Sequence, residues 1–498
     1  MHRTRVTPRR IWVWLLAVGL ALVLVALGYR TWKVWTTVRS LLAQVDSVQA
    51  IAADPTSVDP AALGPMLQET HDGLVVLHDE ARPALTLFPH LGWVPGVGPD
   101  LKALPPLIDI AVDLTDAGTV AMEALAPLLS LMDAGEAPTG EDPLVLIAQT
   151  LEGAQPELET VRVLVNRAAQ RRTELDASQL SSRLLRPVGM LDRALPLAQA
   201  GVEATLLAPD LLGLHGSRTY LLMAQNSDEL RPTGGFITGA GLVTVDGGRI
   251  VSISFRDSYF IDDLSKPYGE PPTPLYDYML SELWLFRDAN WSPDFPISAQ
   301  KAAELYTYGQ GVELDGVIAF DQQAAARLME PLGPITLEGW DEPITSDSLI
   351  RAMRQAWNPS ADGVSREWAR TRKDFMGQLA QAALERIMRH PETVDQLELM
   401  RAMWEVLEER HLLIYLEEAT AASWLRAQGW DGALRLSEGD YLMVVDANLG
   451  FNKVNPNIGR SLEYQVTLHT DGSARAELVI NYQHIGPGDE GPCDQRAT

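Results

Sequence analysis

The longest uninterrupted apolar run of the chain lies close to its N-terminus. Ile11 to Tyr29 comprises 19 residues without a charged side chain, which is long enough to cross the roughly 30 Å hydrocarbon core of a membrane as a helix. Trp12 and Trp14 lie near one end, as an aromatic belt requires. We therefore expect residues 11–29 to be a transmembrane helix. A cleaved signal peptide is the alternative, but such peptides have a shorter apolar core and a cleavage site with small residues.

The charges around this run predict its orientation. The first 39 residues contain seven Lys and Arg and no acid, and four of these Arg precede the run. Because positive residues stay on the cytoplasmic side, residues 1–10 are expected to form a cytoplasmic tail. The remainder of the chain would then lie outside the cell membrane, held by a single-pass anchor.

Beyond the anchor, residues 30–215 show helical periodicity. Leu158, Val161, Val165 and Ala168 follow each other at spacings of three, four and three, which places them on one face of a helix. Turn signals at Asp54-Pro55, in residues 92–99 and at Asp142-Pro143 separate such segments. The pattern predicts an extracytoplasmic region of packed amphipathic helices.

From residue 216 to about 435 the periodicity becomes mixed, which predicts an α/β or α+β core domain. Asp246-Gly247-Gly248 is a hairpin signal between two β-rich runs. Ser346 to Gln428 is predicted to be mostly helical, after a helix at Gln322 to Glu330. The expected strands are Tyr220–Ala224, Phe236–Val245, Arg249–Phe255, Gly316–Phe320 and Ile335–Leu337.

Residues 436–498 are predicted to form a β-rich C-terminal module. Tyr441 to Val445 is one expected strand, and Ser461–His469 and Ala474–Tyr482 flank the turn Asp471-Gly472-Ser473. A hairpin of two strands is marginally stable alone in water. We therefore expect this module to be incomplete here, with further strands supplied elsewhere.

Composition narrows the classes of partner. The chain is 46% hydrophobic and has a net charge of −26, and the residues after position 39 carry 33 basic against 66 acidic side chains. A surface this acidic argues against nucleic acid as a partner. Cys493 is the single cysteine, so neither an internal disulfide nor a zinc site of paired cysteines is expected.

Two predicted strand ends carry clustered charges. Asp228, Glu229 and Arg231 follow one strand, and Arg256 and Asp257 follow another. If the strands are neighbours, these side chains would meet at one sheet edge, where Arg suits phosphate and Asp suits Mg²⁺. The alternative is that they form ordinary ion pairs at strand ends.

Several longer motifs resemble the bacterial family called domain of unknown function 4012. The resemblance covers residues from about 210 to the C-terminus, and the membrane helix and helical region also fit that family's layout. It is carried by NSDELRPTGGFITGAGLVTVDGGRI from Asn226, ANWSPDFPISA from Ala289, DGVIAFD from Asp315 and DANLGFNKVN from Asp446. The family has no established activity.

The core also resembles, more distantly, the LytR-CpsA-Psr family, membrane-anchored enzymes that transfer glycopolymers from a polyprenyl pyrophosphate carrier. Ser254-Phe255-Arg256-Asp257 is similar to that family's Ser-x-Pro-Arg-Asp motif, and Arg370-Thr371-Arg372 to its Arg-x-Arg motif. The resemblance implies that Asp228 and Asp257 hold Mg²⁺ and that Arg256 and Asp257 are catalytic. It also implies substrate binding by Arg256, Arg370, Arg372 and Asp374.

One departure weighs on catalysis. The LytR-CpsA-Psr family continues the Arg-x-Arg helix with two further Arg, where this chain has Gly377 and Ala380 nearby. Two functions therefore remain open. The chain is either an envelope protein whose core binds, and as a phosphotransferase transfers, a polyprenyl-linked glycan, or a non-catalytic scaffold or interaction protein of the cell envelope.

Overall fold

The structure is a computed structural model that describes residues 29, 33, 36, 37, 39, 40, 60–128, 142–357, 374–437, 439–450 and 452–486. The expected cytoplasmic tail, and the expected membrane span apart from Tyr29, lie outside these residues. Within the described part of the chain, no helix combines the length and the apolar character needed to cross a membrane. The chain divides into two compact units, Met1–Glu141 with Val145–Pro209 and Asp142–Leu144 with Asp210–Thr498.

The first unit is a helical bundle, as the periodicity predicted. Leu158, Val161, Val165 and Ala168 are all buried on one face of α6, which confirms the apolar stripe. They pack against residues of α3 and α7 such as Ile110 and Leu195. The elements are α2 (Pro60–Leu85), η2 (Phe88–Leu91), α3 (Gly98–Ala124), α5 (Pro143–Gly153), α6 (Gln155–Thr173), η3 (Ala177–Gln179) and α7 (Ser182–Leu211).

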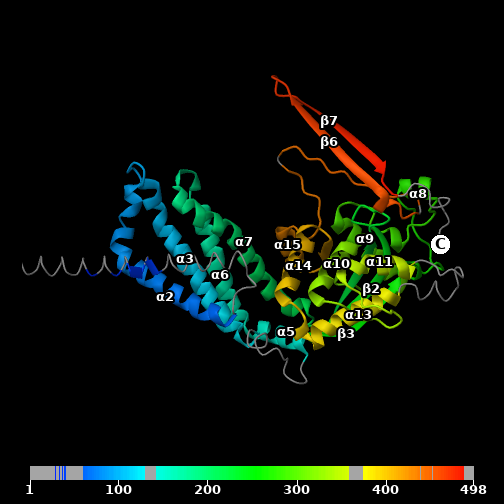
Figure 1. The fold of residues 1–498 in the computed structure, drawn as a ribbon, viewed down its shortest axis with the longest axis horizontal. Coiled ribbons are helices and arrows are strands. Elements are labelled where there is room, and N and C mark those ends of the chain that lie inside the picture. The colour runs from blue at the N-terminus through cyan, green and yellow to red at the C-terminus, as the bar shows by residue number, and fades with distance from the viewer. Residues whose placement is uncertain are drawn as a thin grey trace, which may run out of the picture. The chain divides into compact units, whose positions relative to one another are not determined.

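The second unit is built on a mixed sheet of five strands in the order β3-β2-β1-β4-β5. Its strands β3 and β2 are labelled in Figure 1. β1 runs antiparallel to β2 and parallel to β4, and β2–β3 and β4–β5 are antiparallel. The predicted hairpin at Asp246-Gly247-Gly248 joins β2 to β3. The strands are β1 (Arg218–Asn226), β2 (Phe236–Asp246), β3 (Arg249–Asp257), β4 (Gly316–Phe320) and β5 (Leu412–Leu416).

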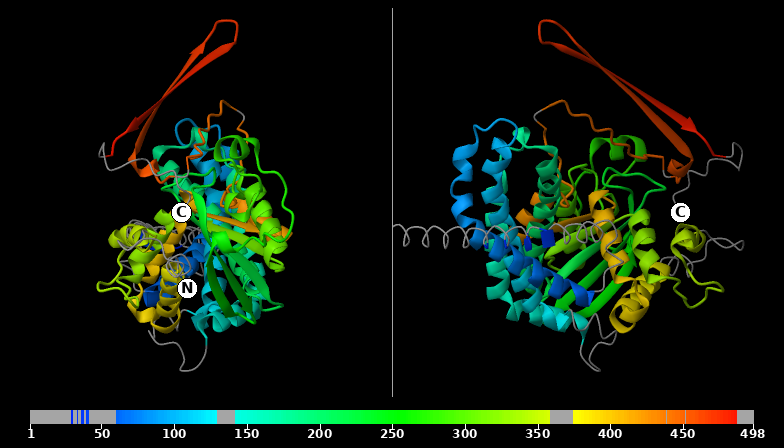
Figure 2. Two further views of the ribbon diagram at one scale, coloured as in Figure 1. Left: turned by 90° about the vertical axis from the view of Figure 1, so that its right-hand side faces the viewer. Right: turned by 60° about the vertical axis from the view of Figure 1, so that its left-hand side comes forward.

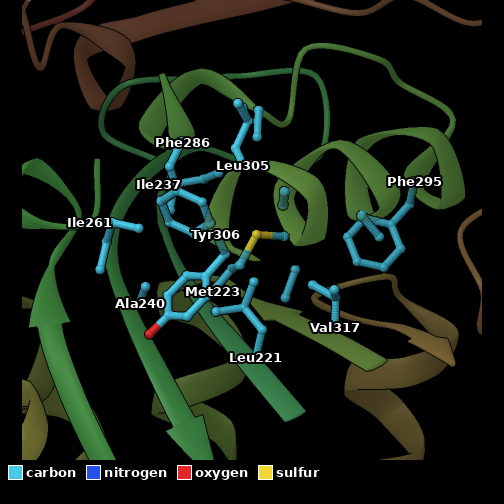
Figure 3. Close-up of a cluster of buried hydrophobic side chains, with 14 of the residues drawn as sticks. Leu221, Met223, Ile237, Ala240, Ile261, Phe286, Phe295, Leu305, Tyr306 and Val317 are labelled. Carbon is cyan, nitrogen blue, oxygen red and sulfur yellow. The ribbon is translucent and has the colours of Figure 1, made fainter. Parts of the chain in front are cut away.

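One face of this sheet packs on α9. Leu221 and Met223 of β1 and Val317 of β4 lie against Phe295 and Tyr306 of α9 in one buried cluster (Figure 3). This cluster includes Ala240 of β2. The elements between β3 and β4 in the chain are η4 (Ser258–Phe260), α8 (Thr273–Met279), η5 (Phe286–Asp288) and α9 (Phe295–Gln310).

A second cluster joins the helices that follow β4. Leu349 and Met353 of α11 and Phe375 of α13 pack with Met329 of α10, and Phe255 of β3 packs against them. The helices that follow β4 in the chain are α10 (Gln322–Met329), η6 (Glu330–Leu332), α11 (Ser346–Trp357), α13 (Asp374–Arg389), η7 (Pro391–Thr393), α14 (Gln396–Glu408) and α15 (Ala419–Gln428).

The two glycines of the Gly239-Ala240-Gly241 sequence make room for Phe255. A Cβ at Gly239 or Gly241 would lie 2.5 or 2.9 Å from the Phe255 ring, closer than real Cβ atoms approach. Gly377 of α13 faces the same side chain, since a Cβ there would lie 3.6 Å from the Phe255 Cβ. These glycines therefore serve the close packing of β2, β3 and α13.

Three predicted elements differ from the structure. β5 lies inside the segment expected to be helical, because a short apolar run such as LLIYL fits a buried strand as well as a helix. Ile335–Leu337 contributes only an isolated bridge from Ile335 to Ile344. The strand predicted at Tyr441–Val445 is wrong, since these residues run without a paired neighbour among the described residues.

The tail ends in the predicted hairpin. β6 (Ile458–Leu468) and β7 (Ala474–His484) follow η8 (Asn455–Asn457) and pair antiparallel around the expected turn. They form a long ribbon of two strands (Figure 2). Most side chains of both strands are exposed.

Candidate functional site

The first candidate residues lie in the turn that leaves β1. The side-chain oxygen of Asn226 accepts a hydrogen bond from the Asp228 backbone N–H at 3.0 Å. Ser227 donates to Gln322 Oε1 of α10 at 2.8 Å. Because β1 and β4 are parallel neighbours and α10 follows β4, these contacts fix the turn at the carboxyl edge of the sheet, where open α/β sheets tend to bind ligands.

Asp228 is engaged there by Arg354 of α11. Arg354 Nε donates to Asp228 Oδ2 at 2.8 Å, and Nη2 donates to Oδ1 at 2.6 Å. The Asp228 side chain is 5% exposed and that of Arg354 is 46% exposed. The hydrogen bonds to Asp228 raise the pKa of Arg354. Both carboxylate oxygens of the expected metal ligand are thus bonded to a guanidinium.

Arg256 lies away from this pair, beside α9. It is opposite Ala240 in the sheet, and its Nη1 lies 3.4 Å from Gln310 Oε1 at the end of α9. Burial raises the pKa of Tyr306, and the charge of Arg256 opposes that rise. Arg256 therefore lies on the face that carries the α9 cluster, whereas Asp228 is held by a helix of the other cluster.

Asp257 has a local structural task. It is buried, it is opposite Gly239, and it accepts a hydrogen bond from the Tyr259 N–H at 3.0 Å as the N-cap of η4. Successive strand residues point to opposite faces, so Arg256 and Asp257 diverge. The structure therefore does not bring Asp228, Arg256 and Asp257 together on one face of the sheet, because Arg256 lies on the face that carries α9.

Glu229 and Arg231 belong to a buried network of ion pairs and hydrogen bonds. The Arg231 side chain is 1% exposed and donates to Glu229 Oε1 at 3.0 Å, to Asp288 Oδ1 at 3.4 Å and to the Asn448 carbonyl at 2.7 Å. Its guanidinium also lies 5.3 Å from the centre of the Phe236 ring. Burial raises the pKa of Glu229, against the lowering effect of Arg231. The arrangement is that of a structural ion pair with both signs of charge buried together.

The segment that contains Arg231 also contacts a motif that is distant in the sequence. The Asn448 N–H donates to the Leu230 carbonyl at 2.9 Å, and Leu230 N–H donates to Asn455 Oδ1 at 3.0 Å. The Asn455 N–H in turn donates to the Asp228 carbonyl at 3.3 Å. The tail motif from Asp446 to Asn455 therefore lies directly on the motif that follows β1.

Asn290 connects the loop of residues 284–296, which contains Trp284 and Trp291, to the same region. It is fully buried, and its Nδ2 lies 2.9 Å from Gln225 Oε1, 2.9 Å from Thr233 Oγ1 and 2.8 Å from the Gly235 carbonyl. In that loop Trp284 donates to the Asp288 carbonyl and has the Lys301 ammonium 4.5 Å from its ring. These contacts make the loop a packed element of the second unit.

The two acids that bound the DGVIAFD motif are likewise structural. Asp315 accepts from the Arg218 side chain at 2.9 Å and from the Thr219 N–H at 2.7 Å. Asp321 caps α10 through two backbone N–H groups and contacts His411 Nδ1 at 2.7 Å. The hydrogen bond to Asp321 raises the pKa of His411.

The remaining predicted ligands lie partly outside the described residues. Arg370 and Arg372 are outside them, and Asp374 begins α13, with only its backbone described. Among the described residues, no three or more His, Cys, Asp and Glu side chains are grouped to hold a metal ion. Asp228 is bonded to Arg354, and Asp257 Oδ1 accepts a hydrogen bond from the Tyr259 N–H.

Arg354 is the residue that sequence reasoning missed. It lies 126 positions from Asp228, and nothing in its local sequence beyond an amphipathic helix marks it. Arg351 and Arg354 are spaced three residues apart, as on any exposed helix surface. Only the position of α11 in the fold therefore identifies the partner of Asp228.

The comparisons with known proteins agree with the first resemblance. Residues 215–357 match the family model described as a protein of unknown function, DUF4012. The match bears out, over these residues, the resemblance that the sequence motifs indicated, and it covers β1 to β4 and α8 to α11. No curated protein matches the chain.

Proposed function

We propose that this chain is a membrane-anchored protein of the cell envelope that acts as a non-catalytic interaction protein. The uncharged run at residues 11–29 and the positive residues before it support the anchor. In this proposal the α/β core is a rigid scaffold, and ion pairs such as that of Asp228 with Arg354 stabilise it.

The observation that carries the proposal is the ion pair of Asp228 with Arg354. A Mg²⁺ ion is bound through carboxylate oxygens, and both oxygens of Asp228 already accept charged hydrogen bonds at 2.8 and 2.6 Å. Because Asp228 is buried but Arg354 is half-exposed, breaking this pair is expected to cost about 2–4 kcal/mol, which a metal would have to offset. The position of Arg256 beside α9 supports the same conclusion.

The alternative function is binding of a polyprenyl pyrophosphate at the same sheet edge. It is tested by titrating the full chain in detergent with a fluorescent polyprenyl pyrophosphate, with and without Mg²⁺. The interaction proposal expects no Mg²⁺-dependent binding and the same result for Arg256→Ala. Saturable binding that needs Mg²⁺ and is lost in Arg256→Ala would overturn it in favour of the lipid-binding enzyme.

A further inference from the structure

The α2–α3 turn, which we define as residues 83–99, contains no Asp, Glu, Lys or Arg. After residues 11–29 it is the longest uncharged stretch of the chain, in which 21% of all residues are charged. It comprises the last residues of α2, the short helix η2 and the first residues of α3. The exposure of such a stretch is informative, because a patch of large apolar side chains in water usually marks an interaction site.

Three large apolar side chains of the turn are exposed. Trp93 is 78% exposed, Leu87 61% and Val97 51%, although Trp is a residue that proteins bury strongly on average. A Trp side chain combines a large apolar ring with one N–H donor. This combination suits the boundary between lipid and water, where Trp is enriched.

The backbone of the turn is held in place by its own hydrogen bonds. The Val94 N–H donates to the Leu91 carbonyl at 3.0 Å, and the Gly98 N–H donates to the Val94 carbonyl at 2.8 Å. Gly98 also lies directly on Gly92, since a Cβ at Gly98 would be 2.4 Å from the Gly92 carbonyl oxygen. Backbone groups that are already bonded cost little to move into a less polar surrounding.

An ion pair joins the end of the expected membrane span to the end of α2 that carries the turn. Lys33 Nζ lies 2.8 Å from Glu80 Oε1, and Lys33 follows the last residue of the expected span, Tyr29, by four positions. Glu80 is five residues before the end of α2 but 20 residues after its start, which is about 30 Å of helix. The turn is therefore at the end of α2 that is fastened to the expected anchor.

The charges around the turn are mixed in sign. The nearest charged residues in the sequence, Arg82 before the turn and Asp100 after it, are opposite. The titratable side chains that line the cavity beside Trp93 are His90, Lys102, Arg171, Glu174 and Asp176. Two carboxylates thus face two permanent cations, whereas acids outnumber basic residues two to one after position 39. The turn can approach anionic headgroups with less repulsion than the average surface of the chain.

We propose that the α2–α3 turn inserts Leu87, Trp93 and Val97 into the headgroup region of the lipid bilayer that holds the anchor. Three side chains bind a bilayer weakly by themselves. Tethering by the anchor raises their effective concentration at the lipid surface, so a weak contact is sufficient. With two points of attachment, the helical bundle has a fixed orientation relative to the membrane. The inference rests on the membrane anchor proposed above.

The test locates single labels relative to lipid and water. The full chain in a Cys493→Ser background is reconstituted into liposomes of phosphatidylcholine and phosphatidylglycerol, with a nitrobenzoxadiazole label at Leu87→Cys or at Val163→Cys. Val163 is the matched control, because it is 58% exposed on α6, where Val161 packs in one cluster with Ala117 towards the other end of α3. The label at position 87 should be quenched by doxyl lipids and protected from iodide, and the label at position 163 should show the reverse.

A second variant tests the role of Trp93. Trp93→Glu should abolish the lipid quenching of the label at position 87, whereas Val163→Glu should leave it unchanged, with equal circular dichroism and melting temperature for the two variants.

Flotation of the liposomes separates the possible failures. A chain that does not float with the liposomes would overturn both the anchor and this inference. A chain that floats while iodide quenches the label at position 87 would overturn this inference alone. Protection of that label from both quenchers, as contact with a second copy or another protein would give, would also overturn it.

Discussion

Asp228 and Arg354 form an ion pair with two hydrogen bonds between residues 126 positions apart, one after β1 and one in α11. The pair fastens α11, and with it the second apolar cluster, to the edge of the sheet. A carboxylate placed by sequence reasoning in a metal site thus acts as an anchor for a helix.

Removal of Arg354 should destabilise the core. Arg354→Ala leaves the buried Asp228 carboxylate without its partner, which we expect to cost about 2–4 kcal/mol of unfolding free energy in urea. Arg351→Ala is the matched control, because Arg351 is exposed one turn earlier on the same helix, and should change stability by less than about 0.5 kcal/mol. In a double-mutant cycle, Asp228→Ala with Arg354→Ala should cost clearly less than the sum of the single changes. Equal effects of Arg354→Ala and Arg351→Ala would contradict the anchor.

Replacing Asn290 by Asp, a side chain of nearly the same shape, should destabilise the fold. Asn290→Asp replaces the Nδ2 donor, which faces the Gln225, Thr233 and Gly235 oxygens, by a carboxylate oxygen. Buried acceptors then face each other, and a loss of about 3 kcal/mol or more is expected. Chemical denaturation followed by Trp fluorescence measures it. Wild-type stability at neutral pH would show that the Asn290 contacts are dispensable.

His411 should make stability depend on pH. Its pKa is raised by the hydrogen bond to Asp321 and, less, by Glu409, against the effects of burial and of Arg327. A raised pKa in the folded state means that the stabilisation is fully present below about pH 6.5 and is lost as pH rises through the folded pKa. The advantage of the wild type over His411→Gln should therefore be larger at pH 6 than at pH 9. His469→Gln, at an exposed position in the hairpin turn, should show no such change. A constant difference for His411→Gln across this range would contradict the assignment.

The topology of the chain remains a prediction that protease protection can check. The uncharged run at residues 11–29 predicts that residues 30–498 lie outside the cytoplasm. Protease added to intact protoplasts should digest the bulk of the chain and leave a small anchored fragment. Full protection until the membrane is permeabilised would reverse the expected orientation.

The sequence predicted the fold better than the site, for physical reasons. Strands β1 to β4 and the stripe on α6 follow from local alternation and helical spacing, which depend on neighbours in the chain. β5 was missed because LLIYL has no period of its own, and Tyr441–Val445 has the composition of a strand but no paired neighbour among the described residues. The local pattern of apolar residues predicts which side chains are buried. Which strands pair depends on the arrangement of the whole sheet.

The site depended on relationships that local sequence does not contain. Asp228 and Asp257 were singled out as charged residues after strands, and both are indeed buried at strand ends. What each one bonds, Arg354 in one case and the Tyr259 N–H in the other, depends on where α11 and η4 fold. The two-residue period of a strand already predicts that Arg256 and Asp257 point to opposite faces of the sheet. This alternation argues against placing both side chains in one cavity.

The most direct test of the central claim, that Asp228 holds Arg354 and not a metal, is divalent-ion binding measured with Mn²⁺ in place of Mg²⁺. Electron paramagnetic resonance follows free Mn²⁺ while it is titrated with the full chain, its Asp228→Asn variant and its Arg354→Ala variant. We predict that the wild type and Asp228→Asn remove Mn²⁺ from solution equally weakly, and that Arg354→Ala alone frees the carboxylate to bind it. Tight Mn²⁺ binding by the wild type that disappears in Asp228→Asn would contradict the account.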